Sequence, residues 1–73
     1  MGHENRCACP CCGLLTLPDR GHYEICRVCD WEDDPIQSQK PDFEGGANAV
    51  SLNQARRNYA EFGTSDPIQR RES

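Results

Sequence analysis

Two pairs of cysteines with the spacing C-x-x-C constrain this chain more than any other feature. The first pair lies in the run CPCCG at residues 9–13, and thirteen residues separate it from the second pair, in CRVC at residues 26–29. A C-x-x-C turn brings two sulfur atoms to one ion, and four thiolates in a tetrahedral set select Zn²⁺, with iron as the competitor. The sequence therefore predicts one metal site with the ligands Cys9, Cys12, Cys26 and Cys29.

The residues around the first pair suit a tight turn. Pro10 fixes one backbone angle of the turn, and Gly13 suits a left-handed conformation directly after the second ligand. Because Cys11 lies between two ligands in this turn, we expect its side chain to point away from the ion.

Four further side chains with metal-binding groups are not needed for this site. Cys7 and Cys11 are either packing cysteines and substitute ligands, or a redox-sensitive or Cu(I)-binding pair of thiols. His3 and His22 are alternative ligands that are less well placed than the four cysteines. We expect His22 on the polar face of a strand.

The chain has few residues from which to build a core. Only fourteen sizeable apolar side chains occur in 73 residues, and small domains of this kind usually need disulfides or a metal to offset the entropy of ordering. A structural zinc site contributes about 10–16 kcal/mol of apparent folding free energy. We therefore expect one domain that folds around zinc, has no room for a large enzyme pocket and is not an enzyme.

Disulfides are the alternative use of the six cysteines. Disulfide frameworks belong to secreted proteins, whose leader contains an apolar run, and residues 1–6 contain none. We therefore expect a cytoplasmic setting and metal binding. The formal net charge is −4, with the acidic surplus in residues 30–44. This charge favours a protein partner over nucleic acid, and no apolar stretch is long enough for a membrane.

Short secondary-structure elements are expected between and after the cysteine pairs. Residues 14–17 and 22–26 are predicted strands, and the run PDRG at 18–21 is a predicted turn that joins them into a β-hairpin. Ser51, with Gln54 three residues later, is typical of a helix start, and Gly63 suits the helix end. The buried face of this helix is predicted to carry Leu52, Ala55, Tyr59 and Phe62.

The segment 30–48 is expected to be an ordered loop or a connector, with a third short strand as the alternative. Its acidic run, DWEDD at 30–34, is interpreted as a solvated surface that attracts a basic partner. The run lacks the glycine and glutamate of a Ca²⁺-binding EF-hand loop, and so small a core cannot desolvate a catalytic pair of carboxylates. Trp31 is expected to pack between the metal module and the helix, with an exposed binding hot spot as the alternative.

Taken together, these residues resemble the bacterial cysteine-rich CPCC family. The resemblance spans about residues 7–63 and implies a small zinc-binding domain without an established activity. In this family the second pair often reads C-P-V-C-F-W, and Arg27 and Asp30 take the two variable places here. The resemblance rests on CPCCG at 9–13, YEIC at 23–26, VC at 28–29, WEDD at 31–34, GG at 45–46, Asn48, SL at 51–52, AR at 55–56, Asn58 and FG at 62–63.

The predicted fold is a small α+β domain. It consists of a zinc-ribbon-like β-hairpin with two Cys knuckles plus one C-terminal amphipathic helix. We expect a flexible N-terminus over 1–6, a single zinc-binding domain over 7–63 and a polar tail over 64–73. The predicted function is a non-enzymatic structural zinc module that mediates protein interaction. The alternatives are a nucleic-acid-binding zinc ribbon, suggested by Arg56, Arg57 and the tail, and a sensor of thiol redox state or metal.

Overall fold

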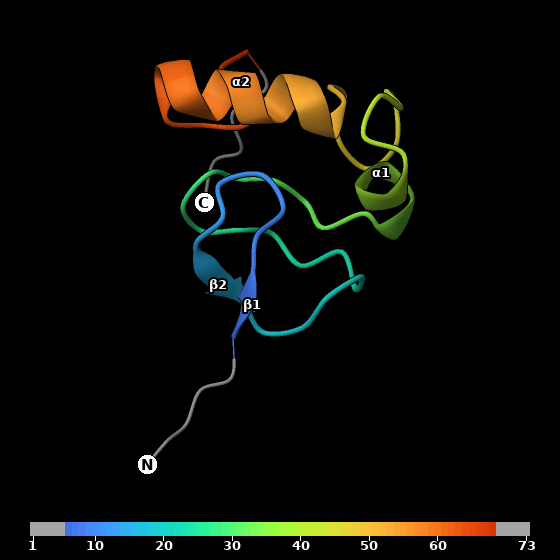
Figure 1. Ribbon diagram of the computed structural model, residues 1–73, viewed down its shortest axis with the longest axis vertical. Coiled ribbons are helices and arrows are strands. Elements are labelled where there is room, and N and C mark those ends of the chain that lie inside the picture. Colours follow the sequence, from blue (N-terminus) through green and yellow to red (C-terminus); the bar gives the residue numbers. More distant parts are fainter. Residues whose placement is uncertain (1–5, 69–73) are drawn as a thin grey trace.

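The computed structural model describes residues 6–68, which form a two-stranded sheet and two helices (Figure 1). Strands β1 (Cys7–Ala8) and β2 (Leu15–Leu17) are followed by helices α1 (Pro35–Gln39) and α2 (Leu52–Phe62). In Figure 1, α2 lies at one end of the fold, above the loops that connect the other elements. Neither helix in this segment has the length and apolar character that a membrane crossing requires.

Each cysteine pair lies at the tip of its own hairpin. Strand β1 pairs antiparallel with β2 across the first cysteine pair, with Cys7 opposite Leu17. The second hairpin is built the same way across the second pair. It contains a bridge between Ile25 and Glu32 and a hydrogen bond of 2.9 Å from the Asp33 amide to the Glu24 carbonyl.

The predicted class of fold, a small α+β domain of zinc-ribbon type, is confirmed, but the predicted strand pairing is wrong. Residues 14–17 pair with β1 and not with residues 22–26. The reason is that each C-x-x-C turn reverses the chain and brings its own flanking residues into contact. Residues 18–21 therefore connect two hairpins instead of forming the turn of one.

Helix α2 begins and ends at the predicted residues. The Ser51 hydroxyl accepts a hydrogen bond of 3.1 Å from the Gln54 amide, and Gly63 follows the helix with a φ of 77°. The predicted buried face is right for Leu52 and Ala55 but wrong for Phe62, which is 57 % exposed. The buried stripe continues through the polar Asn58 instead, because the chain after α2 folds back over that residue.

The acidic segment is not the solvated loop that the sequence predicted. Asp33 and Asp34 are only 3 % and 4 % exposed. Asp34 caps α1, because one carboxylate oxygen accepts the Ile36 and Gln37 amides, and its other oxygen accepts the Ala47 amide at 2.9 Å. The carboxylates are buried because they pair with backbone N–H groups that would otherwise lack partners.

Gln37 of α1 organises the loop that leads to α2. Its side chain is fully buried, and its amide nitrogen donates to the carbonyls of Phe43, Asn48 and Val50 at 3.0–3.2 Å. Its oxygen accepts from the Asn48 backbone at 3.0 Å and from the Asn48 side chain at 2.9 Å. One side chain thus holds an irregular stretch of backbone that has no strand or helix of its own.

The core combines cysteines with a few apolar side chains. Trp31 is completely buried, as expected, and belongs to a cluster that also contains residues of β2 and α2. This core connects both hairpins to the helix. The buried apolar residues are Cys9, Cys11, Leu17, Cys26, Cys29, Trp31, Leu52 and Ala55.

Candidate metal centre

The two cysteine pairs have the same local backbone structure. In the first knuckle the Gly13 amide donates to the Cys9 carbonyl at 2.8 Å, and in the second the Asp30 amide donates to the Cys26 carbonyl at 2.8 Å. Both Gly13 and Asp30 have positive φ, 82° and 69°. The left-handed residue after the second cysteine is therefore part of the knuckle, and Asp adopts it more readily than most non-glycine residues.

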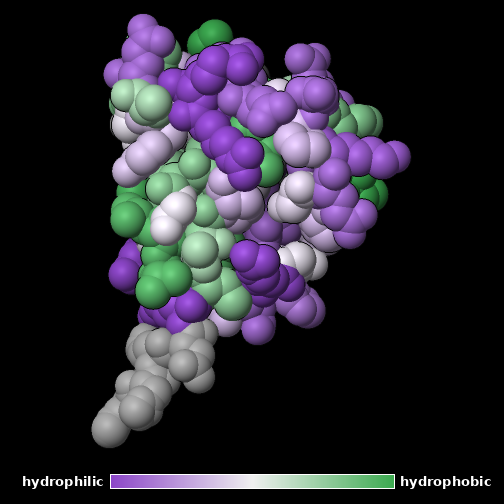
Figure 2. Space-filling model, in the orientation of Figure 1, coloured by the Kyte–Doolittle hydropathy of each residue, from purple (hydrophilic) through white to green (hydrophobic). Residues whose placement is uncertain are grey.

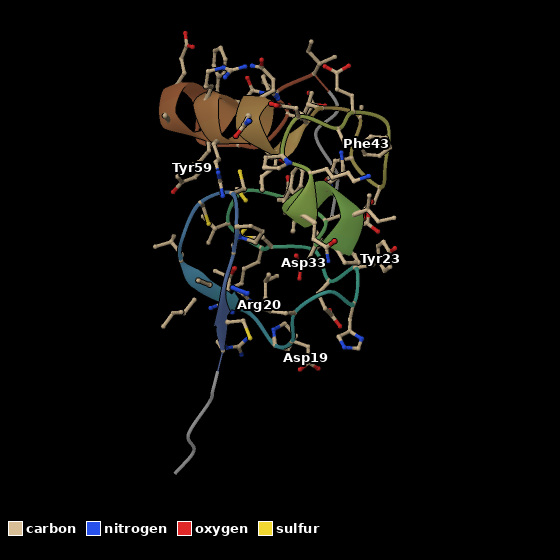
Figure 3. All side chains as sticks on the ribbon, turned by 45° about the vertical axis from the view of Figure 1, so that its right-hand side comes forward. Asp19, Arg20, Tyr23, Asp33, Phe43 and Tyr59 are labelled. Atoms are coloured by element: carbon tan, nitrogen blue, oxygen red, sulfur yellow. The ribbon has the colours of Figure 1, made fainter. Side chains whose placement is uncertain are left out.

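The four predicted ligands lie together between the hairpins. Their sulfur atoms are all within 4.8 Å of one another. Two sulfur pairs, each with one atom from either knuckle, are separated by 3.6 Å (Cys9 and Cys29) and 3.8 Å (Cys12 and Cys26). Figure 3 shows sulfur atoms gathered in the space below α2. Cys12 is partly exposed and the other three are buried, so the cluster can hold a metal ion within the core.

Cys26 is the thiol that the surroundings favour most strongly as a thiolate. Burial alone would raise the pKa of Cys26, but hydrogen bonds from Thr16 and from the Cys29 and Val28 amides lower this pKa to about 7. The Thr16 hydroxyl lies 3.0 Å from the sulfur, and the two amide nitrogens lie at 3.3–3.4 Å. The protein itself therefore supplies hydrogen-bond donors that stabilise a thiolate at this sulfur.

The other three thiols keep their protons more tightly. A hydrogen bond with Cys29, together with burial, raises the pKa of Cys9. Burial raises the pKa of Cys12 to about 11. The pKa of Cys29 is also raised, first by a hydrogen bond with Cys11. An ion that binds all four sulfurs must displace these protons, so its binding is coupled to pH.

Backbone N–H groups point at all four sulfurs. The amides of Cys11 and Cys12 act on the sulfur of Cys9. The Leu14 amide acts on the sulfur of Cys12. The Trp31 amide acts on the sulfur of Cys29. Each of these contacts lowers the pKa of its sulfur. This arrangement follows from the knuckle backbone, and it stabilises thiolates once their protons have left.

Residues outside the knuckles support the second one. The Ser65 amide donates to the Cys29 carbonyl at 2.7 Å, and the Thr64 hydroxyl does so at 3.3 Å. The Asn58 side chain in turn donates to the Ser65 carbonyl at 2.8 Å. Sequence reasoning missed these residues and Thr16. Strand alternation gave no signal for Thr16, because the next residue of β2, Leu17, is buried as well.

The remaining cysteines and histidines take different positions. Cys11 is buried and, as predicted, is not one of the four clustered ligands, although its thiol raises the pKa of Cys29. Cys7 is partly buried against the core. His22 is exposed and lies outside the cluster. His3 lies outside the described residues.

The fold and the thiol cluster define a small cysteine-rich domain able to hold a metal ion between two knuckles. A family model described as Cysteine-rich CPCC matches residues 7–73. The chain therefore belongs to the cysteine-rich CPCC family, which confirms the resemblance found in its sequence. No curated protein matches the chain significantly.

Proposed function

We propose that this protein is a non-enzymatic structural zinc module that binds another protein. The observation that carries the metal part is the cluster of four sulfur atoms within 4.8 Å of one another. Cys9, Cys12, Cys26 and Cys29 would hold the ion. A set of four thiolates selects zinc over harder cations, with iron as the competitor, and four protein ligands are typical of structural sites without an open position for a substrate.

Metal stoichiometry tests this assignment. Protein purified from metal-balanced medium is expected to contain one zinc per chain by elemental mass spectrometry. Substitution of any one ligand, such as Cys26→Ser, is expected to lower zinc affinity strongly, whereas Cys7→Ser, outside the cluster, is the matched control. One iron per chain would overturn the choice of zinc, and retention of metal in all four ligand variants would overturn the site.

The exposed apolar side chains near the knuckles support a role in protein binding. Leu14 and Leu15 are 46 % and 64 % exposed at the start of β2, and Ile25 and Val28 of the second hairpin are 47 % and 40 % exposed. Figure 2 shows apolar residues gathered on the side of the molecule that carries β2 in Figure 1. Large apolar side chains that remain exposed in so small a protein are suited to an interface.

Crosslinking tests the interaction. The zinc-loaded protein, carrying a photoreactive group at Leu15, is expected to crosslink to a reproducible protein partner in extracts of its source. The same group at Glu61, an exposed residue on α2, is the control position. Failure to recover a partner from Leu15 above the control would contradict the proposed interaction while leaving the metal assignment intact.

One observation favours a second candidate function, the sensing of thiol redox state. Cys11 is not needed as a ligand, and its buried thiol raises the pKa of Cys29, so a spare thiol lies near the proposed zinc site. Thiol counting on the zinc-loaded protein tests this alternative. Two rapidly reactive thiols would favour sensing, and none would eliminate it.

A further inference from the structure

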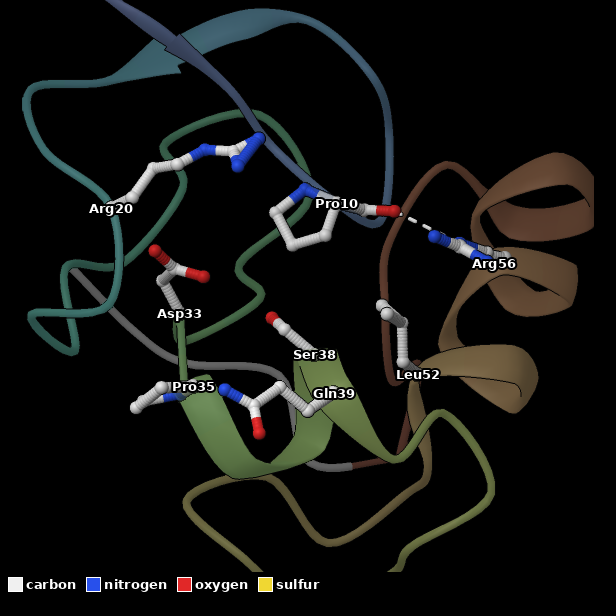
Figure 4. A pocket seen from close by; sticks show the side chains of 8 residues that line it. All are labelled: Pro10, Arg20, Asp33, Pro35, Ser38, Gln39, Leu52 and Arg56. Carbon is white, nitrogen blue, oxygen red and sulfur yellow. Dashed lines mark hydrogen bonds between the residues drawn. The ribbon is translucent and has the colours of Figure 1, made fainter.

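A polar cavity lies beside the first knuckle, away from the four clustered thiols in the sense that none of them lines it. Its volume is about 340 Å³, and it opens between the first knuckle, α1 and α2 (Figure 4). The residues that matter for its chemistry are Arg20, Asp33, Ser38 and Arg56, with Pro10 and Leu52 as apolar walls. None of these is a predicted metal ligand.

The cavity has hydrogen-bond donors without acceptors. The Ser38 hydroxyl oxygen is buried, and nothing in the described part of the chain forms a hydrogen bond with it. Among residues 6–68, the Arg20 side chain has no hydrogen bond or ion pair. The Arg56 guanidinium uses only Nε, which donates to the Pro10 carbonyl at 2.9 Å. The buried Ser38 hydroxyl requires a partner, which a ligand can supply. The two exposed guanidinium groups have N–H donors left for the same ligand.

One acceptor, Asp33, faces the same space. This carboxylate is 3 % exposed and accepts the Gly21 amide with a single oxygen at 2.6 Å. Two guanidinium groups and one carboxylate leave the cavity with one net positive charge, in a chain whose formal net charge is −4. The ligand that fits must therefore bring an anionic acceptor for the arginines and, beside it, a donor for Asp33.

We propose that this cavity binds the C-terminal residue of a polypeptide. A chain terminus carries its carboxylate and its amide N–H on the same α-carbon, so it offers the acceptor and the donor at adjacent positions. The carboxylate is placed between Arg20 and Arg56 with Ser38 as a further donor, and the amide N–H faces Asp33. Pro10 and Leu52 receive the terminal side chain. This assignment names the partner's chemistry and rests on the proposed role in protein binding.

Chemical-shift titration of the zinc-loaded full chain tests the proposal. The probe is acetyl-Ala-Ala-Leu with a free carboxylate. It is expected to give saturable shifts at residues 20, 33, 38 and 56. The same peptide as its terminal amide, acetyl-Ala-Glu-Ala-amide and inorganic phosphate are expected to bind at least tenfold more weakly. Equal binding by any of these three would overturn the assignment to a chain terminus.

Two arginine variants separate the cavity from general charge attraction. Arg20→Gln is expected to weaken binding of the free-carboxylate peptide at least fivefold. Arg57→Gln removes the same charge from α2 outside the cavity, where Arg57 bonds to Gln54 at 2.8 Å, and is expected to leave binding unchanged. Equal loss in both variants, or no saturable shift in the wild type, would overturn the proposal.

Failure of the proposal for the cavity can be distinguished from failure of the proposed role in protein binding. If the protein crosslinks to a partner through Leu15 but does not bind the free-carboxylate peptide, the proposed ligand of the cavity is wrong. The proposed role in protein binding then stands. If the protein binds the peptide but recovers no partner from Leu15, the interaction proposed for the surface around Leu15 is contradicted and the proposed ligand of the cavity stands. Retention of zinc throughout the titration shows that the folded protein was measured.

Discussion

At the scale of single residues, Thr16 shows how a side chain outside the four cysteines adjusts the metal site. Its hydroxyl donates to Cys26, the thiol with the lowered pKa. We expect Thr16→Val to raise the pKa of Cys26 above about 7 and to lower zinc affinity about 10- to 100-fold, since a hydrogen bond to a charged group contributes about 1.5–3 kcal/mol. Competition with a chelating dye measures this affinity.

The pH dependence of the same variant follows from the direction of the shift. Zinc binds the thiolate, so raising the pKa of Cys26 moves the pH of half-maximal zinc loading upward. Thr16→Ser keeps the hydroxyl and is expected to behave like the wild type. A loading curve that is the same for Thr16→Val and Thr16→Ser would show that the hydroxyl does not act on the site.

Gly13 has a purely conformational role. Its φ is 82°, and a Cβ atom added there would meet no atom within 4 Å. We expect Gly13→Ala to lower the free energy of unfolding of the zinc-loaded protein by about 1–2 kcal/mol, because only the left-handed backbone opposes the substitution. Gly13→Asn should cost less, since Asn tolerates this conformation. Urea unfolding measures both, and equal stability of Gly13→Ala and the wild type would contradict this role.

At the scale of elements, the sequence predicted what is encoded locally. Ser51 and Gly63 mark the ends of α2 because capping involves residues within one turn of the helix. The partner of residues 14–17 was missed, because two alternating runs separated by PDRG fit a hairpin equally well. The deciding contacts lie in the knuckle turns, where the Cys9 amide bonds to the Leu14 carbonyl at 2.8 Å.

The short helix α1 was missed for a different reason. Its five residues have no periodicity to detect, and its stability comes from the distant partners of Gln37. We expect Gln37→Leu to lower the free energy of unfolding by about 2–4 kcal/mol, because it leaves buried carbonyls without donors. Gln39→Leu, at an exposed position of the same helix, is the control and should change stability by less than about 0.5 kcal/mol. Thermal unfolding of both variants decides, and equal effects would contradict the role of Gln37.

At the scale of the whole molecule, the four thiols occupy the position that an apolar core has in a larger protein. Cys9, Cys26 and Cys29 are buried among Leu17, Trp31 and the start of α2. The C-x-x-C spacing sufficed to predict which four cysteines would meet, because two short turns leave few ways to combine them. The supporting contacts of Asn58 and Ser65 were beyond prediction, since they depend on how α2 and the chain after it pack on the second knuckle. The contact of Thr16 depends on how the two hairpins meet.

Removal of the metal should therefore disrupt the fold as a whole. Without an ion, the bonds that would join the two knuckles through their four sulfurs are absent, and the buried apolar residues alone are few. We expect a strong chelator to abolish the helical circular-dichroism signal of α2 together with the near-ultraviolet signal of Trp31, and zinc to restore both. Acidification should do the same, because protons compete with the ion for the thiolates and the affinity falls as pH falls. Cys7→Ser, which keeps all four clustered thiols, should lose its signals at the same pH as the wild type. An unchanged spectrum after elemental analysis has confirmed metal loss would show that the core folds without the ion.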